Sequence, residues 1–89
     1  MITKVAKIEN KLGIHARPAS LFVKTAGQFE SDIRIEKDGV EVNGKSIMSV
    51  MMLAAEKGSE ITITAEGVDE KEAIDSLIKL VEERKFDEE

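Results

Sequence analysis

The apolar residues of this chain change their spacing several times within 89 residues, and this succession of periods constrains the fold more than any other feature. Residues 2–8 and 60–65 mostly alternate between apolar and polar side chains, which is the pattern of a half-buried strand. Residues 33–35 and 40–42 alternate in the same way on either side of Asp38-Gly39. An Asp-Gly pair between alternating segments strongly favours a tight β-hairpin. The chain is therefore expected to form four strands, two of them joined as a hairpin.

Apolar residues between and after these strands recur at the spacing of amphipathic helices. One stripe begins after Ala16 and ends near Gly27, a residue that often terminates helices. A wider stripe follows Asp69, which is expected to cap its helix with Glu72 at the third helical position. The stripes consist of Ala19, Phe22, Val23 and Ala26 in the first helix and of Ala73, Ile74, Leu77, Ile78 and Val81 in the last.

A third apolar segment, residues 47–55, follows Ser46. Its spacing suits a short helix, although so apolar a run can also form a buried strand, and we favour the helix. The order strand-helix-strand-strand-helix-strand-helix then predicts a two-layer α/β sandwich with a mainly antiparallel sheet. No linker or repeat divides the sequence, so residues 1–89 are expected to form one domain, with residues 87–89 frayed and solvated.

The composition limits what else the chain can be. With no cysteine and one histidine, neither a disulfide nor a zinc site is expected, so dense aliphatic packing must stabilise the core. The formal net charge of -5 disfavours nucleic acid and anionic membranes, and no apolar run is long enough to span a bilayer. We therefore expect a cytoplasmic monomer without a metal, a cofactor, a nucleic-acid partner or direct membrane insertion.

The only histidine, His15, lies where a strand is expected to give way to a helix. An imidazole is nucleophilic and changes charge near pH 7, and the first N–H groups of a helix attract anions. Arg17 adds a guanidinium that suits phosphate oxygens, and Pro18 fits the first helical turn. Most lone histidines at such places only cap a helix or lie on the surface. Here the neighbours predict a nucleophile beside an anion site formed by Arg17 and the backbone of Ala16 and Arg17.

The sequence has no second histidine and no glycine-rich nucleotide loop, so it lacks a device for selecting a substrate. This combination is typical of a carrier that other proteins load and unload, rather than of an independent enzyme.

Ser46 is a second candidate site. Its ordinary role would be to cap the short helix, and a phosphate on its hydroxyl would be favoured by the same helix terminus. Met48, Met51 and Met52 are ordinarily core residues, and at least one is expected to be buried. Exposed methionines would instead suit a surface that meets several partners, and the candidate surface consists of Ile47, Met48 and Met51.

Two segments of the chain resemble the HPr family, the histidine-containing phosphocarrier proteins of the bacterial sugar phosphotransferase system. Gly-Ile-His-Ala-Arg-Pro-Ala at 13–19 is similar to the family's active-site signature, and Lys-Ser-Ile-Met-Ser-Val-Met at 45–51 is similar to its regulatory serine segment. The resemblance covers essentially the whole chain. It implies an open-faced sandwich in which three helices cover one face of four antiparallel strands in the order 1-4-2-3.

The resemblance also implies roles for three residues. His15 matches the histidine whose Nδ1 accepts a phosphoryl group from phospho-Enzyme I and passes it to the Enzyme IIA components of sugar permeases, and Arg17 matches the arginine that assists this transfer. Ser46 matches the serine that an HPr kinase/phosphorylase modifies in many family members. That modification slows charging of the histidine and promotes binding to a catabolite-control repressor.

One position departs from the family pattern. Leu12 stands where the family often has a small polar side chain near the phosphohistidine. Local support for a phosphoryl group on His15 is then expected from backbone N–H groups and Arg17, or from a shifted loop.

Three functions remain in competition. The first is a phosphoryl carrier acting through His15, and the second is a regulatory module of the same fold acting mainly through Ser46. A regulatory paralogue in the family lacks the histidine, and the presence of His15 favours the carrier. The third is a small α/β interaction domain without covalent chemistry.

Overall fold

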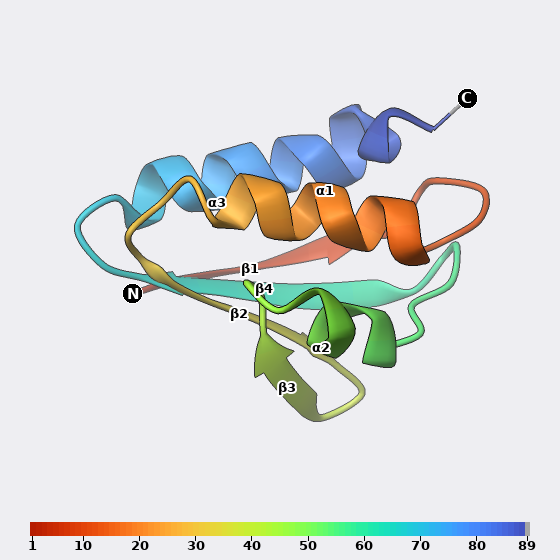
Figure 1. Ribbon diagram of the computed structural model, residues 1–89, viewed down its shortest axis with the longest axis horizontal. Helices are drawn as coiled ribbons and strands as arrows, with labels where there is room; N and C mark the ends of the chain where they lie inside the picture. The colour runs from red at the N-terminus through yellow and green to blue at the C-terminus, as the bar shows by residue number, and fades with distance from the viewer. Residues whose placement is uncertain (89) are drawn as a thin grey trace.

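The computed structural model describes residues 1–88 and consists of one sheet with helices packed on one of its faces (Figure 1). A π-helical turn, Lys79–Glu83, continues the last helix, and a short 3-10 turn, Lys85–Asp87, follows it. The principal elements are β1 (Ile2–Lys7), α1 (Ala16–Ala26), β2 (Asp32–Lys37), β3 (Val40–Asn43), α2 (Ile47–Met52), β4 (Glu60–Glu66) and α3 (Glu70–Ile78).

The four strands are all antiparallel and lie in the order β1-β4-β2-β3. Asp38 and Gly39 join β2 to β3 with φ values of 52° and 83°, as a tight hairpin turn between twisted strands requires. The register places Ile35 opposite Ile63, so their side chains point to the same face of the sheet. The expected fold class, strand order and hairpin are confirmed, and the 47–52 segment is a helix rather than a buried strand.

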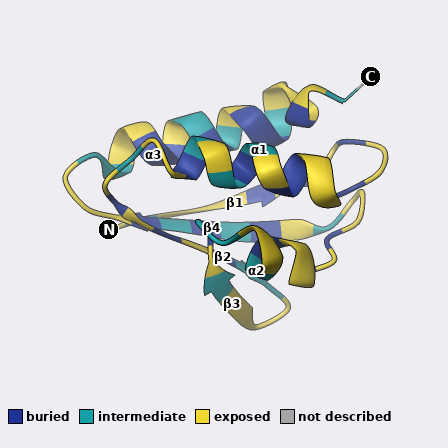
Figure 2. Ribbon diagram, in the orientation of Figure 1, coloured by how far each residue is buried: buried dark blue, intermediate teal, exposed yellow. Residues whose placement is uncertain are grey.

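The core lies between this face of the sheet and the helices above it (Figure 2). β4 shows the expected alternation, because Ile61, Ile63 and Ala65 are buried while their neighbours are not. α1 and α3 lie side by side over the sheet and bury Phe22 and Leu77 against it. The apolar face of the sheet and the apolar stripes of the helices therefore pack against each other in one core.

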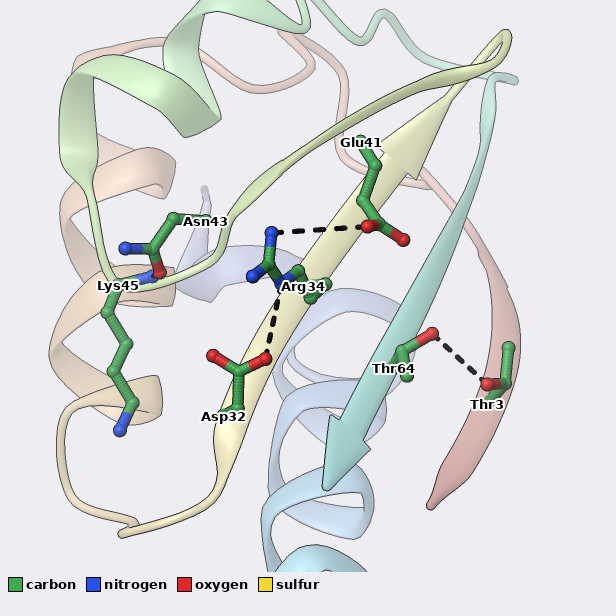
Figure 3. Close-up of polar contacts among 7 residues, drawn as sticks. All are labelled: Thr3, Asp32, Arg34, Glu41, Asn43, Lys45 and Thr64. Carbon is green, nitrogen blue, oxygen red and sulfur yellow. Dashed lines mark hydrogen bonds and ion pairs between the residues drawn. The ribbon is translucent and has the colours of Figure 1, made fainter. Parts of the chain in front are cut away.

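The opposite face of the sheet is uncovered, and several polar side chains interact across it (Figure 3). The Thr3 and Thr64 hydroxyls form a hydrogen bond of 3.1 Å between β1 and β4. Arg34 donates from Nε to Asp32 at 3.2 Å and lies 4.0 Å from a Glu41 oxygen on β3. Exposed pairs of this kind contribute little to stability, and they keep this face wet. The open face explains why the apolar pattern of the strands has a period of two.

Asp69 does not cap α3 as expected. Although it precedes the helix, its carboxylate forms no capping bond and instead accepts hydrogen bonds from the loop that contains Glu30 and Ser31. Glu70 takes the local role, because its Oε1 accepts the Gly67 N–H at 3.1 Å. The cap prediction was wrong because a neighbouring loop brings three donors to Asp69, including the Ser31 hydroxyl.

The expectation that at least one methionine of α2 is buried was also wrong. Met48, Met51 and Met52 are 71%, 40% and 77% exposed. Val50 alone on this helix is buried, and Leu53 just beyond it closes the core. The helix is only six residues long, so it turns one narrow face inward and the methionines remain outside.

Asp87 and Glu88 are held by side-chain contacts, in contrast to the fraying expected for residues 87–89. Phe86 is 1% exposed, and Arg84 forms an ion pair with Asp87. Glu88 hydrogen-bonds to the loop that precedes α1. Residue 89 lies outside the described residues.

Candidate functional site

His15 is the N-cap residue of α1, with an extended backbone and an exposed side chain. Its side chain forms no capping bond, while its carbonyl accepts the Ala19 N–H at 2.9 Å and begins the helix. The imidazole is therefore not occupied by a structural role and remains accessible to a second molecule.

The turn before His15 is held by Gly13 and Ile14. Gly13 has a φ of +70°, and a Cβ at this position would lie 2.5 Å from the Ala55 carbonyl oxygen. Only glycine fits such a close approach in the left-handed region. The buried Ile14 then donates its N–H to the same Ala55 oxygen at 2.8 Å. This anchor fixes the backbone one residue before the imidazole and explains the Gly-Ile-His order.

The N-terminus of α1 offers two free backbone donors beside the imidazole. Ala19 is the first residue whose N–H enters the helical ladder, and Pro18 has none. Within residues 1–88, no acceptor takes the N–H of Ala16 or Arg17. Helix N-termini with free N–H groups favour anions. The two donors predicted from the sequence are thus available next to His15.

Arg17 is exposed, and no carboxylate within residues 1–88 lies close enough to form an ion pair with it. Its guanidinium is therefore free to bind an incoming anion. His15 and Arg17 share a shallow pocket of about 220 Å³ with Leu12, Pro18, Phe86 and Glu88. Such a pocket is open to a partner surface, and it can hold a small anionic group.

Sequence analysis missed Glu88, the only carboxylate among the residues that line this pocket. Its side chain accepts the backbone N–H of Lys11 at 2.6 Å and that of Leu12 at 3.3 Å, and the side-chain amide of Asn10 at 3.0 Å. The hydrogen bond from Asn10 is the main reason that the pKa of the Glu88 carboxyl is lowered. The Leu12 and Lys11 N–H groups and the nearby His15 lower that pKa further.

Asn10 is the second residue that sequence analysis missed. It is 2% exposed, and its Nδ2 donates to the Gly13 carbonyl at 2.7 Å as well as to Glu88. Asn10 therefore ties the glycine turn to the C-terminal segment. Asparagine in a loop before a glycine has many ordinary roles, and nothing in the local sequence indicated a contact 78 residues away.

Ser46 lies at the N-cap of α2, as expected. Its Oγ accepts the Ser49 N–H at 3.4 Å, and its side chain is partly exposed. The adjacent candidate partner surface is accessible, since Ile47 is 39% exposed and Met48 and Met51 are more so. Met52 extends this apolar surface, although sequence analysis did not include it.

The fold and the site together define a small two-layer α/β protein that presents one accessible imidazole at a helix N-terminus. A pocket of about 220 Å³ adjoins this imidazole. The family model described as PTS HPr component phosphorylation site matches residues 2–83. The chain belongs to the HPr family of the phosphotransferase system, which includes proteins named phosphocarrier protein HPr.

Similar proteins carry two names. The HPr-like protein Crh of Halalkalibacterium halodurans is 51% identical over 92% of this chain and 98% of its own length. The phosphocarrier protein HPr of Treponema pallidum is 44% identical over the whole of both chains. Sequence similarity thus extends both to a phosphocarrier protein HPr and to an HPr-like protein Crh.

Solved structures share the fold along the whole chain. HPr-C-His from Thermoanaerobacter tengcongensis has a TM-score of 0.94 at 50% identity, covering 100% of this chain and 99% of that one. An HPr dimer from the same organism has a TM-score of 0.75 at 48% identity, covering 96% and 98%. Within residues 1–88, no helix is both long and apolar enough to cross a membrane.

Proposed function

We propose that this protein carries a phosphoryl group on His15, which it accepts from phospho-Enzyme I and passes to Enzyme IIA components of sugar permeases. The observation that carries the proposal is the accessible imidazole of His15 beside the free N–H groups of Ala16 and Arg17. Membership of the HPr family supplies the donor and acceptor classes.

The resemblance to the HPr family implies that Nδ1 of His15 is the attacking atom. The nitrogen lone pair forms a bond to phosphorus while the bond between phosphorus and the donor breaks. The negative charge on the phosphoryl oxygens is then stabilised by the two backbone N–H groups and by the Arg17 guanidinium. Because the pocket is shallow, the same atoms remain open to the next acceptor, as a carrier requires.

Incubation with phosphoenolpyruvate and Enzyme I tests this proposal. One acid-labile phosphoryl group should appear on the protein and be absent from His15→Ala. An active Enzyme I that forms no such adduct with the unaltered protein would refute the carrier function.

We also propose a regulatory phosphorylation at Ser46 by an ATP-dependent HPr kinase/phosphorylase, which promotes binding to a catabolite-control repressor. Similarity to an HPr-like protein Crh supports this second function, as does the partly exposed Ser46 hydroxyl at a helix start. An acid-stable phosphate should form and be lost in Ser46→Ala but retained in Ser49→Ala. Labelling that persists in Ser46→Ala would exclude this residue as the target.

Ile47, Met48 and Met51 are proposed as the surface that these partners share. Their side chains are exposed although they are apolar, which is typical of a surface that is covered in complexes. Met48→Lys should weaken transfer from Enzyme I without unfolding the protein, because Met48 contributes little to the core.

The expected cytoplasmic monomer remains a proposal, since a similar HPr forms a dimer. Light scattering at several protein concentrations will distinguish one chain from two.

A further inference from the structure

The Glu88 carboxylate is held by three residues of the loop that leads to His15. It accepts the Lys11 N–H at 2.6 Å, the Leu12 N–H at 3.3 Å to each oxygen, and an Asn10 amide hydrogen at 3.0 Å. Charged acceptors form stronger hydrogen bonds than neutral ones. A single side chain from the far end of the described chain thus organises the loop at residues 10–12.

The backbone is strained where it delivers Glu88 to this loop. Lys85, Phe86 and Asp87 have consecutive φ values of 49°, 55° and 55°, in the left-handed region that residues other than glycine avoid. Burial of Phe86 and the ion pair between Arg84 and Asp87 hold this turn in place. Such a conformation persists only where surrounding contacts enforce it, and strained backbone concentrates at functional sites.

Glu88 also carries its charge into the candidate site. It lines the same pocket as His15 and Arg17. A phosphoryl group on His15 would bring a charge of about -2 into this small volume. Like charges in one pocket repel each other, so the bound carboxylate and the phosphoryl group oppose one another.

We propose that Glu88 is a positioning residue that latches the 10–12 loop while His15 is unphosphorylated and is displaced when His15 carries a phosphoryl group. This inference rests on the proposed function of His15. The latch is the set of hydrogen bonds from Glu88 to Asn10, Lys11 and Leu12. Thermodynamic linkage makes this effect mutual. If the phosphoryl group weakens the Glu88 hydrogen bonds, those hydrogen bonds also favour loss of the phosphoryl group to the next acceptor.

The latch contacts Leu12 through its backbone. The family often has a small polar side chain at this position, whereas the Leu12 side chain is 68% exposed and offers no polar atom. Its backbone N–H is instead bonded to Glu88. The latch therefore acts on the backbone at position 12 and does not depend on a polar side chain there.

Chemical phosphorylation tests the latch without Enzyme I. Phosphoramidate transfers its phosphoryl group to an imidazole nitrogen: the phosphorus bond to the amine breaks, a phosphorus bond to His15 forms, and ammonia leaves. Since His15 is the only histidine, the product carries one phosphohistidine. Amide hydrogen exchange at Lys11 and Leu12, followed by NMR, then reports whether the Glu88 hydrogen bonds open.

Exchange at both amides should accelerate by about fivefold on phosphorylation, the factor expected for like charges brought close together in solvent. The Ile14 amide, bonded to Ala55, should not respond and is the internal control. In Glu88→Gln, which retains an acceptor oxygen but no charge, the response should be largely lost. Glu88→Asp should partly restore it, and Glu83→Gln, an exposed carboxylate outside the pocket, should behave as the unaltered protein.

Unchanged exchange at Lys11 and Leu12 after phosphorylation would overturn the latch, as would an undiminished response in Glu88→Gln. Both results leave the carrier function intact, because that function is tested by transfer from Enzyme I. If phosphoramidate labels the protein but an active Enzyme I does not, the carrier function is refuted. The latch can still be tested by amide exchange on the labelled protein. If phosphoramidate leaves His15 unlabelled, the same exchange measurement is made on protein charged by phosphoenolpyruvate and Enzyme I. Labelling by neither route would refute both proposals.

Discussion

The carboxylate of Asp69 accepts the hydroxyl of Ser31 at 2.5 Å, and this bond joins the start of α3 to the loop between α1 and β2. The same carboxylate accepts the backbone N–H groups of Glu30 and Ser31 at 2.9 and 3.0 Å. The Ser31 side chain is buried, so its hydroxyl needs this partner. Gly67 lies against it, and a Cβ there would come within 2.7 Å of Ser31.

Replacing Asp69 should destabilise the protein in a pH-dependent manner. The hydrogen bond from Ser31, followed by that from the Glu30 N–H, lowers the pKa of the Asp69 carboxyl from its ordinary value. A lowered pKa in the folded state contributes stability that is fully present above the unfolded pKa and is lost as the pH falls through the folded one. At about pH 6, Asp69→Ala should therefore have a lower melting temperature than the unaltered protein. The difference between the two melting temperatures should decrease towards about pH 2. A difference in melting temperature that does not change with pH would show that the ionised Asp69 carboxylate is not its cause.

Gly13 should be irreplaceable at the turn before His15. Gly13→Ala places a Cβ 2.5 Å from the Ala55 oxygen at a φ of +70°, so both overlap and backbone strain oppose it. We expect a loss of about 2 to 4 kcal/mol in the free energy of unfolding by denaturant titration. Gly39→Ala is the matched control, because Gly39 has a similar φ of +83° but open space around it. Its cost should be only about 1 kcal/mol, and equal losses in the two variants would contradict a role for the Ala55 contact.

The arrangement of strands and helices was predictable because burial repeats along each element. Ile61, Ile63 and Ala65 alternate with exposed residues on β4, and the stripe of α1 buries Ala19 and Phe22. The place of His15 at a helix start was equally local, since it depends on Gly13 and on the helix that follows.

The contacts of Asp69 and Glu88 could not be predicted, because their partners lie 38 and 77 residues away along the chain. An acidic residue before a helix ordinarily caps it, and an acidic end of a chain is ordinarily solvated. Tertiary packing overrides both tendencies here. The methionines of α2 are exposed although their apolar side chains predicted burial. The helix is only six residues long and buries Val50 alone, which apolar character by itself did not indicate.

Reversing the charge of Arg17 should slow phosphoryl transfer while the fold is retained. The side chain is exposed and forms no ion pair within the described chain, so Arg17→Glu breaks no salt bridge there. We expect the transfer rate from Enzyme I to fall by about tenfold to a hundredfold, the range for losing one donor to a developing anion. Lys57→Glu makes the same charge change at a turn outside the pocket and should transfer normally. Equal rates in Arg17→Glu and the unaltered protein would remove Arg17 from the mechanism.

Phe86 should couple global stability to the loop before His15. Its ring is 1% exposed and lines the pocket with His15, and it holds the left-handed turn that delivers Glu88. Phe86→Ala should cost about 3 kcal/mol in the free energy of unfolding, as large-to-small core substitutions do. It should also speed amide exchange at Lys11 and Leu12, because their acceptor is released. Phe29→Ala removes the same ring at a half-buried position outside the pocket, so it should cost less and leave both amides protected relative to Ile14. If Phe86→Ala and Phe29→Ala accelerated amide exchange at Lys11 and Leu12 equally, the acceleration would reflect lower global stability. Phe86 would then have no specific role in positioning Glu88.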